Sequence, residues 1–347
     1  MTGDLTRKIH EFLAKLQRDM EGAVAEQMAA GAAAITDFKP WVDEYYESTK
    51  QFLDDAYAQL TDQDARLSPE ARSVEVALHR LLVQPFFLNA PTPRWSIIKP
   101  FGYPGDYQLV ERLFDARPTG SSPLGVLLEA WGLQCGPSRS HRARRPWACA
   151  RLAALGSRTP GRPLQVLSFA CGPERILRDF TGAECALTLC DFDAAALEYA
   201  AKQMVATARQ QGRAAPELRS VRQSAYRLIK DPAEARELMA PTVAAQDGFD
   251  AVLVLGLLDY LDDAAVQRFV GALATVLRPG GELLLSNLHV QNPWRSFMEY
   301  AAEWTVAHRT VEGFERLVHA DGRSETLEIG PDGDSGTNLF YVGRRVA

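Results

Sequence analysis

The chain has 347 residues, of which 46% are hydrophobic and 24% are charged, and its formal net charge is −6. These proportions supply a sizeable core and exclude a wholly disordered protein, and the length permits two domains or one α/β domain with a large extension. Because there is no basic excess, nucleic acid is not expected as the main partner.

The five cysteines are an odd number and form no CxxC pair, which predicts reduced thiols rather than a disulfide scaffold. The six histidines are scattered without metal-ligand spacing, so we expect no metal site. The first thirty residues lack the apolar block of a signal peptide, and no stretch approaches the roughly 20 apolar residues of a membrane helix. These features predict a cytoplasmic protein without a membrane partner.

The N-terminal part of the chain shows helical periodicity and no alternating strand pattern. Apolar residues recur at helical spacing, and Ser68-Pro69-Glu70 is typical of a helix start. An aromatic, glycine-rich loop at 99–107 interrupts the helices, and residues 157–163 are typical of a linker. We therefore expect an all-helical N-terminal or lid domain over residues 1–158, and a homodimer through its first helices is left open.

After the linker, apolar strands alternate with helices. Such strands indicate a mostly parallel sheet that is covered by helices on both faces. The tail predicts a final antiparallel hairpin, and the second domain spans residues 159–347. The expected strands are 164–170, 186–192, 217–221, 250–256, 278–289, 326–330 and 338–345.

The end of the first strand carries the strongest signal for a ligand. A dinucleotide site requires G-x-G-x-x-G, but only Gly172 is present and Pro173 has no N–H for a phosphate. Asp191 follows nineteen residues after Gly172, at the end of the second strand, where a carboxylate can accept both hydroxyls of a ribose. A ribose site without a pyrophosphate cradle indicates a nucleoside ligand such as S-adenosylmethionine. The alternative is that the loop is only a turn and Asp191 a helix cap.

Four segments together carry a resemblance to a known family. They are Lys99-Pro-x-Gly-Tyr-x-Gly-Asp-Tyr107, Ala170-Cys-Gly-Pro-x-Arg175, Gly256-Leu-x-Asp-Tyr-Leu-x-Asp263, and Asn287-x-His289 with Asn292-Pro, Met298-Glu-Tyr, Trp304 and Arg309. The block from 164 to 289 resembles class I S-adenosylmethionine-dependent methyltransferases. More narrowly, the four segments together resemble the bacterial family that includes the 3-hydroxypalmitate methyl ester synthases, over roughly residues 95–345. Ala170 and Glu174 stand where most class I enzymes have glycines, which implies a tighter first loop.

The resemblance implies a Rossmann-like class I methyltransferase sheet of seven strands, the last one antiparallel, with S-adenosyl-L-methionine as cofactor. The loop at 99–107 is expected to act as a lid over the cofactor, and we call it the lid loop. In it, Tyr103 or Tyr107 could face the sulfonium through a cation–π contact, and Asp106 could bind the methionyl ammonium. The cofactor site is then expected to comprise Tyr103, Asp106, Tyr107, Ala170, Cys171, Gly172, Asp191, Phe192, Ser224, Ala225 and Gly256.

The residues expected at the reacting centre are Tyr103 together with two pairs at strand ends. Asp259 and Tyr260 follow the fourth strand; the alternative is that Asp259 caps the helix at Asp262 and Tyr260 lies in the core. Asn287 and His289 share one side of the fifth strand, because side chains alternate with a period of two. They could hold a substrate carboxylate or hydroxyl, or His289 could act as base, unless it is bonded to a backbone carbonyl.

Two further groups of side chains lie near the predicted site in the sequence. Cys171 lies beside the first loop without a partner base, so nucleophilic catalysis by its thiol is rejected. Arg142, Arg144 and Arg145 are expected to form a solvated helix face, from which one guanidinium could hold a carboxylate in bidentate fashion.

The resemblance implies methyl transfer to a small-molecule oxygen, namely the carboxylate of a fatty-acid-like or polyketide-like acid in signalling or secondary metabolism. Most of the rate would come from positioning, because a carboxylate is already ionised at neutral pH. One alternative is a cyclase that converts S-adenosylmethionine to azetidine-2-carboxylate and methylthioadenosine. Another is a non-catalytic partner that binds the cofactor.

Overall fold

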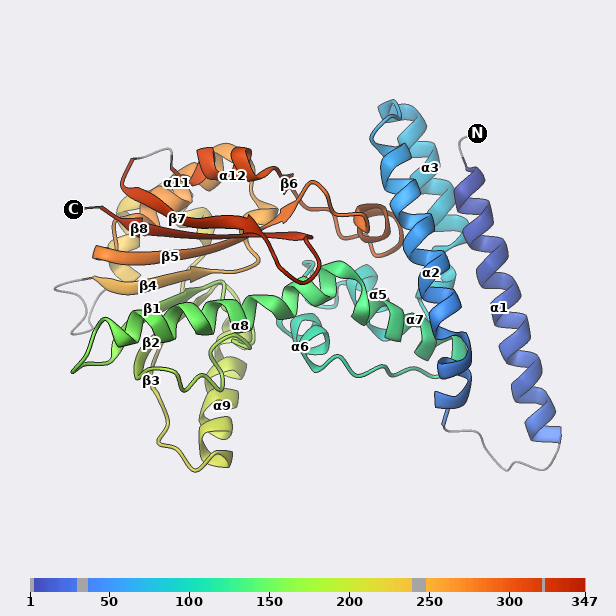
Figure 1. Cartoon of the computed structure of the whole chain (residues 1–347), viewed down its shortest axis with the longest axis horizontal. Helices are drawn as coiled ribbons and strands as arrows, with labels where there is room; N and C mark the ends of the chain where they lie inside the picture. The colour runs from blue at the N-terminus through green and yellow to red at the C-terminus, as the bar shows by residue number, and fades with distance from the viewer. Residues whose placement is uncertain (1–2, 30–36, 239–247, 320–321, 347) are drawn as a thin grey trace. The chain divides into compact units, whose positions relative to one another are not determined.

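The computed structural model describes residues 3–29, 37–238, 248–319 and 322–346 (Figure 1). The chain divides into two compact units: Met1–Arg139 with Asn292–Thr305, and Ser140–Gln291 with Val306–Ala347. None of the helices in the described ranges is long and apolar enough to cross a membrane.

The first unit consists of helices, as the periodicity predicted. Helix α3 begins where the sequence indicated, because Ser68 Oγ accepts the N–H of Ala71 and Pro69 occupies the first turn. The helices of this unit are α1 (Asp4–Ala29), α2 (Lys39–Asp64), α3 (Pro69–Leu82), α4 (Gln84–Phe87), α5 (Pro91–Ile98), α6 (Tyr107–Asp115), α7 (Pro123–Gln134) and the π-helix η4 (Phe297–Ala301).

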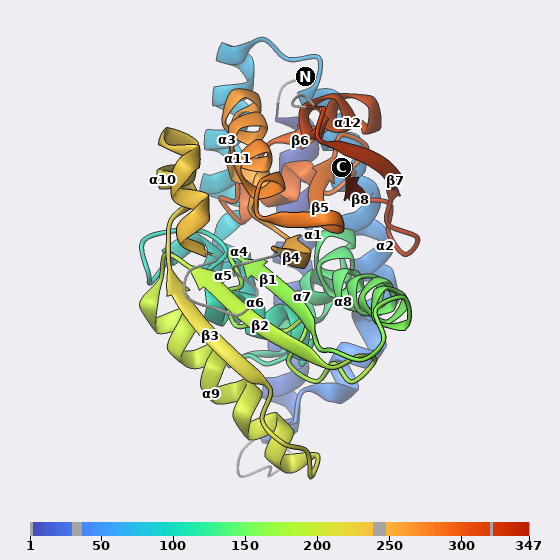
Figure 2. The same cartoon turned by 90° about the vertical axis from the view of Figure 1, so that its left-hand side faces the viewer.

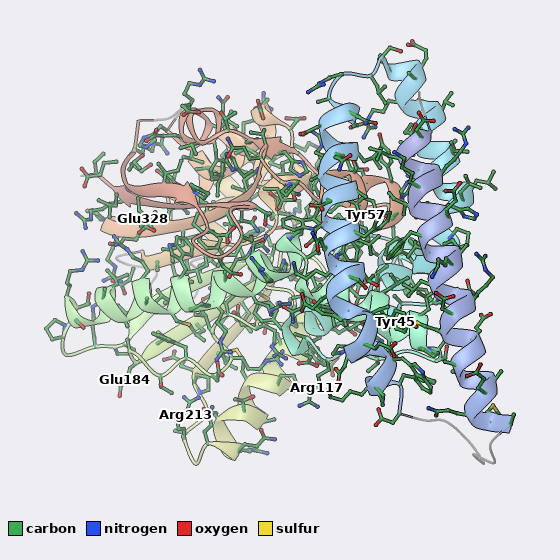
Figure 3. The ribbon with its side chains drawn as sticks, turned by 45° about the vertical axis from the view of Figure 1, so that its right-hand side comes forward. Tyr45, Tyr57, Arg117, Glu184, Arg213 and Glu328 are labelled. Carbon is green, nitrogen blue, oxygen red and sulfur yellow. The ribbon has the colours of Figure 1, made fainter. Side chains whose placement is uncertain are left out.

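Aromatic side chains form the centre of the first unit. Tyr57 of α2, labelled in Figure 3, stacks on Trp131 of α7 with ring centroids 5.7 Å apart. Phe297 of η4 meets Trp131 edge to face at 4.7 Å and Tyr57 at 5.3 Å. All three side chains are buried, so η4 belongs to this core although it follows the sheet strands in the sequence.

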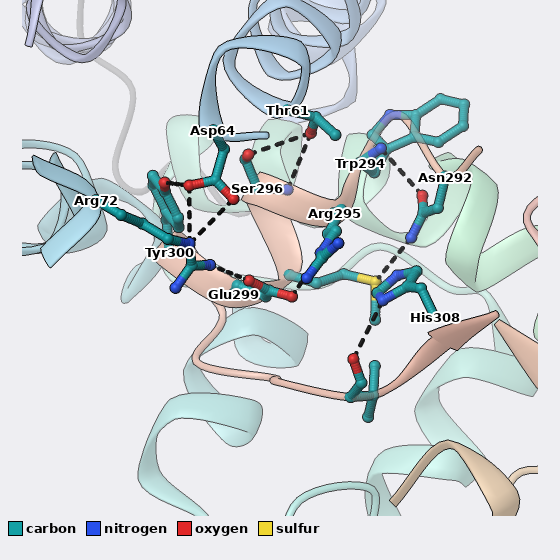
Figure 4. Close-up of polar contacts among 12 residues, drawn as sticks. Thr61, Asp64, Arg72, Asn292, Trp294, Arg295, Ser296, Glu299, Tyr300 and His308 are labelled. Carbon is teal, nitrogen blue, oxygen red and sulfur yellow. Dashed lines mark hydrogen bonds and ion pairs between the residues drawn. The ribbon is translucent and has the colours of Figure 1, made fainter. Parts of the chain in front are cut away.

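Polar contacts also fasten residues 292–305 to the helices of the first unit (Figure 4). Arg72 of α3 pairs with Glu299, and its Nε lies 2.9 Å from Asp64 Oδ1. Thr61 Oγ1 donates to the carbonyl of Pro293 at 3.0 Å. The predicted boundary at residue 158 does not include this return of the chain, because it depends on contacts between residues far apart in the sequence.

The second unit is built on a sheet in the order β3-β2-β1-β4-β5-β8-β7, with the short β6 paired to β5. Strands β1 to β5 pair in parallel, whereas β8 runs antiparallel to both β5 and β7. Figure 2 shows β1, β2 and β3 side by side. The seven-strand prediction with a reversed last strand is confirmed, and β6 is an addition. The strands are β1 (Leu164–Phe169), β2 (Cys185–Asp191), β3 (Glu217–Arg222), β4 (Phe249–Val254), β5 (Leu277–His289), β6 (His308–Arg309), β7 (Ser324–Pro331) and β8 (Asn338–Arg345).

Helices cover both faces of this sheet, as the apolar strands indicated. Val252 and Val254 of β4 belong to one hydrophobic cluster, with side chains of α10, α11 and α12. Ala251 and Leu253 alternate with them and belong to a second cluster, with side chains of α8 and α9. The elements outside the sheet are α8 (Gly136–Ser157), α9 (Ala194–Gln210), α10 (Ala225–Lys230), α11 (Asp263–Ala274), α12 (Val311–Val318) and the 3-10 turns η1 (Pro232–Leu238) and η3 (Leu258–Tyr260).

Helix α8 explains the remaining difference from the predicted domain boundary. It begins at Gly136, in the first unit, but Ala148, Leu152 and Leu155 are buried in the cluster that covers β1, β2 and β4. Most of α8 therefore packs as part of the second unit, although its sequence pattern is helical like that of the preceding segments.

Candidate functional site

The order of the strands reverses beside β1, which pairs in parallel with β2 on one side and β4 on the other. In open parallel sheets, ligands bind beyond the carboxyl ends of the strands at such a point. The loops that follow β1, β2 and β4 in the second unit therefore define the candidate site.

The loop after β1 folds tightly against the end of β2. Ala170, Gly172 and Glu174 all adopt positive φ angles, of 52°, 51° and 48°. For Ala170 and Glu174 this conformation costs about 1–2 kcal/mol each, which the surrounding contacts offset. The N–H of Cys171 donates to the carbonyl of Cys190 at 3.1 Å, and the N–H of Gly172 donates to Asp191 Oδ2 at 2.9 Å.

The carboxylate of Asp191 joins this loop to the end of β2. Only 6% of Asp191 is exposed, and its second oxygen accepts the N–H of Asp193 at 3.0 Å. Burial raises the pKa of Asp191, and the hydrogen bonds from Asp193 and Gly172 oppose that shift. A carboxylate has about four lone-pair sites, more than these backbone donors use, so acceptor capacity remains for ligand donors. The helix-cap alternative is wrong, because the side chain of Asp193 caps α9.

The next part of the candidate site consists of residues that follow β2 and β3. Asp191 pairs with Arg222 in the sheet, and Arg222 Nε donates to the carbonyl of Phe192 at 3.1 Å. The Phe192 side chain is half exposed. Ser224 caps α10 by accepting the N–H of Tyr226, and Ala225 begins that helix. The predicted cofactor residues after β1, β2 and β3 therefore gather at neighbouring strand ends.

Two groups in the first loop bear on its chemistry. Burial raises the pKa of the Cys171 thiol well above its usual value, so little thiolate exists at neutral pH, in line with the rejection of this nucleophile. Glu174 is buried; its Oε1 accepts the N–H of Leu177 at 3.0 Å, whereas Oε2 has no hydrogen-bond partner. Burial raises the pKa of Glu174 as well. In the sequence, Glu174 stands out only as a departure from glycine.

Asp259, expected at the reacting centre, fastens the ends of two strands. It is buried in η3, its Oδ1 accepts the N–H of Leu288 at 2.6 Å, and its carbonyl accepts the N–H of Ala307 at 2.7 Å. Burial raises the pKa of Asp259, whereas the charges of Arg144 and Arg309 and the hydrogen bond from Leu288 lower it. These contacts indicate a positioning role.

The alternative explanation of this segment is wrong in both parts. The cap of α11 is Asp262, whose Oδ1 accepts the N–H of Ala265 at 2.8 Å, so Asp259 does not cap that helix. Tyr260 is 39% exposed and is therefore not a core residue. The contact of Tyr260 with the reacting centre remains a prediction.

Asn287 differs from its predicted role. Its side chain is buried, and Nδ2 donates to the carbonyls of Leu288 at 2.8 Å and Ala307 at 3.1 Å. Its Oδ1 accepts from Arg309 Nη1. Because both N–H donors are used inside the second unit, the expected donation to a substrate is corrected to a positioning role, in which Asn287 holds Arg309 and the chain at Ala307.

His289 is bonded to a backbone carbonyl, which is the alternative that the sequence left open for it. Its side chain is mostly buried, and Nδ1 lies 3.3 Å from the carbonyl of Gly336. A carbonyl can only accept, so Nδ1 carries the proton and Nε2 keeps a lone pair when the ring is neutral. A role as base is chemically compatible with this bond and remains a prediction.

The predicted lid loop lies in the first unit. Asp106 is buried as the N-cap of α6: Oδ1 accepts the N–H groups of Gln108 and Leu109, and Oδ2 accepts Trp95 Nε1 at 2.8 Å. The rings of Phe101 and Tyr107 are 5.3 Å apart. Both Asp106 oxygens thus shape the loop. The expected cofactor contacts of Tyr103, Asp106 and Tyr107 remain predictions.

The basic cluster on α8 is not the uniform solvated face that the sequence suggested. Arg145 pairs with Asp179, and its side chain is 41% exposed. Arg144 is only 4% exposed and reaches Gly256, which follows β4. No signal in the sequence separates Arg144 from its two neighbours, because its burial depends on segments far away in the chain.

No protein-family model matches the sequence. No curated protein matches it. Among solved structures, the chain is similar to a possible exported protein from Bordetella parapertussis, at 19% identity and a TM-score of 0.57 over 86% of this chain and 97% of that one.

Two methyltransferase structures show weaker similarity. One is magnesium protoporphyrin IX methyltransferase from Synechocystis with bound S-adenosylmethionine, at 13% identity, a TM-score of 0.41, and coverage of 60% of this chain and 83% of that one. The other is the N-methyltransferase NodS from Bradyrhizobium japonicum, at 14% identity, a TM-score of 0.38, and coverage of 59% and 97%. The likeness to the Bordetella protein shows that this chain shares its fold over most of its length.

Proposed function

We propose that the chain is an S-adenosylmethionine-dependent methyltransferase that esterifies the carboxylate of a fatty-acid-like or polyketide-like acid. The observation that carries the cofactor is the contact between Asp191 and Gly172, 2.9 Å long, at the point where the strand order reverses. It places a carboxylate with acceptor capacity to spare beside a loop in which Gly172 is the glycine that follows the strand.

The charges of this loop favour a cationic nucleoside over a dinucleotide. Pro173 offers no N–H to a pyrophosphate, and two buried carboxylates belong to the same region: Glu174, the next residue, and Asp191, which accepts the N–H of Gly172. An anionic diphosphate would be repelled there, whereas S-adenosylmethionine carries a sulfonium and an ammonium. The half-exposed ring of Phe192 supports the same choice, because it can stack on a base.

When bound, S-adenosylmethionine supplies an electrophilic methyl group on sulfur. An acceptor carboxylate is ionised at neutral pH, so the protein needs to orient it and exclude water rather than remove a proton. Asp191 would hold the ribose, and the loop after β1 would fix its position through Gly172. Asp259 and Asn287 would act indirectly, by holding the ends of β4 and β5 in place.

The identity of the acceptor rests on the resemblance of the four segments described above. A place in signalling or secondary metabolism rests on the same resemblance. The predicted cytoplasmic location rests separately on the odd number of cysteines and the lack of a CxxC pair.

The cyclase is the second candidate, and one observation favours it. Cyclisation requires a neutral amine on the methionyl group, and hence a base for the ammonium. Glu174 is a buried carboxylate whose Oε2 has no partner and whose pKa burial raises, which suits a group that takes up a proton.

One incubation tests these functions against each other. Purified protein receives S-adenosylmethionine alone and then together with 3-hydroxypalmitate, palmitate or octanoate, and the products are identified by mass spectrometry. S-adenosylhomocysteine and a methyl ester that appear only with an acid support the methyltransferase. Methylthioadenosine without any acid supports the cyclase and overturns the first proposal. Cofactor binding without turnover in either case indicates a non-catalytic partner.

A further inference from the structure

Arg144 is a buried cation whose described contacts are all with uncharged groups. Its Nη1 lies 3.0 Å from His141 Nδ1 and 3.4 Å from the carbonyl of Leu255, and Nη2 lies 3.3 Å from Asn338 Oδ1. Burial and the charge of Arg144 lower the pKa of His141 well below its usual value, so that ring is neutral. Within the described ranges, Arg144 forms no ion pair.

Arg309 is another buried arginine of the second unit, and its guanidinium has a carboxylate among its partners. Its Nη1 donates to the carbonyl of Leu258 at 3.0 Å and to Asn287, its Nη2 donates to the carbonyl of Leu261, and its Nε lies 3.0 Å from the carboxylate of Asp263. By contrast, Nε of Arg144 is buried and has no hydrogen-bond partner. A buried, charged donor without an acceptor is costly, typically by about 1–3 kcal/mol or more. Arg309 has a carboxylate partner and Arg144, only 4% exposed, has none in the described ranges, which indicates that Arg144 lacks an anion.

Two N–H donors of the Arg144 guanidinium remain. A guanidinium has five N–H groups, of which the contacts above use two on Nη1 and one on Nη2. The Nε–H and the second N–H of Nη2 remain. Parallel donors of this kind match the two oxygens of a carboxylate, so the free edge fits a bidentate ligand.

The surroundings hold the guanidinium at the carboxyl end of β4. Gly256 follows that strand with a φ of 106°, and a Cβ there would lie 2.5 Å from Arg144 Nη1. On another side, Asn338 Nδ2 donates to Ser140, and its backbone N–H donates to Asp332 Oδ2 at 2.9 Å. These contacts turn Asn338 Oδ1 toward Arg144. The arginine is therefore preorganised at the edge of the sheet that carries the candidate site.

Electrostatics agree with an anionic ligand. Burial lowers the pKa of Arg144, and the charges of Asp259, Tyr260 and Asp332 oppose that shift from a distance. Neither the Asp259 nor the Asp332 carboxylate lies within 4.0 Å of the guanidinium in the described part of the chain, so their compensation is incomplete.

We propose that Arg144 binds a ligand carboxylate through its Nε and Nη2 donors. This inference rests on the proposed function for the chemistry of the ligand. That function offers two sources of the group, namely the acceptor acid and the methionyl part of the cofactor.

The test compares Arg144→Met and Arg144→Lys with the wild type by calorimetry. The probes are S-adenosylhomocysteine, methylthioadenosine, which lacks the amino-acid carboxylate, and 3-hydroxypalmitate with and without S-adenosylhomocysteine. Arg145→Met is the matched control, because Arg145 lies next to Arg144 and its partner Asp179 is part-exposed. A melting curve of each variant checks that it is folded.

If Arg144 holds the methionyl carboxylate, Arg144→Met weakens S-adenosylhomocysteine binding at least tenfold and leaves methylthioadenosine unchanged. If it holds the acceptor, S-adenosylhomocysteine is unchanged and 3-hydroxypalmitate weakens at least tenfold. Arg144→Lys should be intermediate, since it keeps the charge but loses the planar edge. Two outcomes would overturn the proposal. In one, Arg144→Met binds every probe as tightly as the wild type does; in the other, its affinity falls equally for all probes, including methylthioadenosine.

The outcome is separable from that of the proposed function. If the wild type binds 3-hydroxypalmitate or S-adenosylhomocysteine but transfers no methyl group, methyl transfer fails while the role of Arg144 is still decided by the variants. If the wild type makes the ester and Arg144→Met makes it with unchanged KM and kcat, the role of Arg144 fails alone. A wild type that binds none of the probes overturns both.

Discussion

Oδ2 of Asp191 accepts the N–H of Gly172, so one carboxylate at the end of β2 holds the loop that follows β1. The same side chain accepts the N–H of Asp193 through its other oxygen. Asp191 thus joins the loop after β1, the end of β2 and the start of α9. Its loss should affect both the conformation of the loop and the affinity for the ligand.

Asp191→Ala should weaken S-adenosylmethionine binding by ~1–3 kcal/mol, because charge-assisted hydrogen bonds to the ribose are lost. Titration calorimetry measures the change. Asp193→Ala is the control, since the Asp193 side chain caps α9 nearby by accepting the N–H of Ala195 and has no assigned ligand contact. Unchanged affinity in Asp191→Ala would mean that the ribose binds elsewhere.

The protein should not bind NAD. The loop offers Pro173 where a phosphate needs an N–H, and the buried carboxylates of Glu174 and Asp191 would repel a pyrophosphate. Calorimetry with NAD and with S-adenosylhomocysteine under the same conditions checks this. Micromolar binding of NAD would contradict the step from this loop to its ligand.

Substitution of Tyr103 should affect turnover more than folding if the loop at 99–107 closes over the cofactor. Tyr103→Phe keeps the ring and should lower kcat/KM slightly, whereas Tyr103→Ala should lower it at least tenfold, or ~1.4 kcal/mol. The melting temperature without ligand should change little, because Tyr103 is only partly buried. A sharp fall in that temperature with normal turnover would make the loop a structural anchor.

Asp259→Asn should change how stability depends on pH. Burial raises the pKa of Asp259 above its usual value of 3.8, so the folded protein binds this proton more tightly than the unfolded chain. The contribution of Asp259 to stability is therefore full at pH values below about 3.9 and is lost as pH rises through the folded pKa. Asparagine does not titrate but can still accept the N–H of Leu288.

The free energy of unfolding of Asp259→Asn relative to wild type should consequently increase from pH 4 to pH 7. Urea titrations at each pH measure this difference. Asp259→Ala, which loses the Leu288 hydrogen bond, should be less stable than Asp259→Asn by ~1–3 kcal/mol at every pH. A relative stability of Asp259→Asn that falls with pH would contradict a raised pKa.

Local patterns in the sequence were sufficient for the strands and for the ligand end of the sheet. β1, β2, β4 and β5 are apolar runs that reflect burial on both faces, and β7 and β8 form the expected hairpin. Asp191 could be chosen as a candidate because the spacing of a loop and a strand end is a local property of a βαβ unit. Ser68 could be identified as a cap for the same reason, since its partner is three residues away.

The roles of individual polar side chains were decided by tertiary structure. Asn287 and Arg309 are 22 residues apart, and Arg144 and Asn338 are 194 apart, yet these pairs determine which donors are used and which remain. Residues 292–305 likewise join the helical unit through Phe297, far from α2 in the sequence. The sequence by itself determined the strands and the acidic residue at the end of the second one, because these follow from short-range periodicity and spacing. Only the tertiary structure decided burial and hydrogen-bond partners, because both depend on which distant segments the fold brings together.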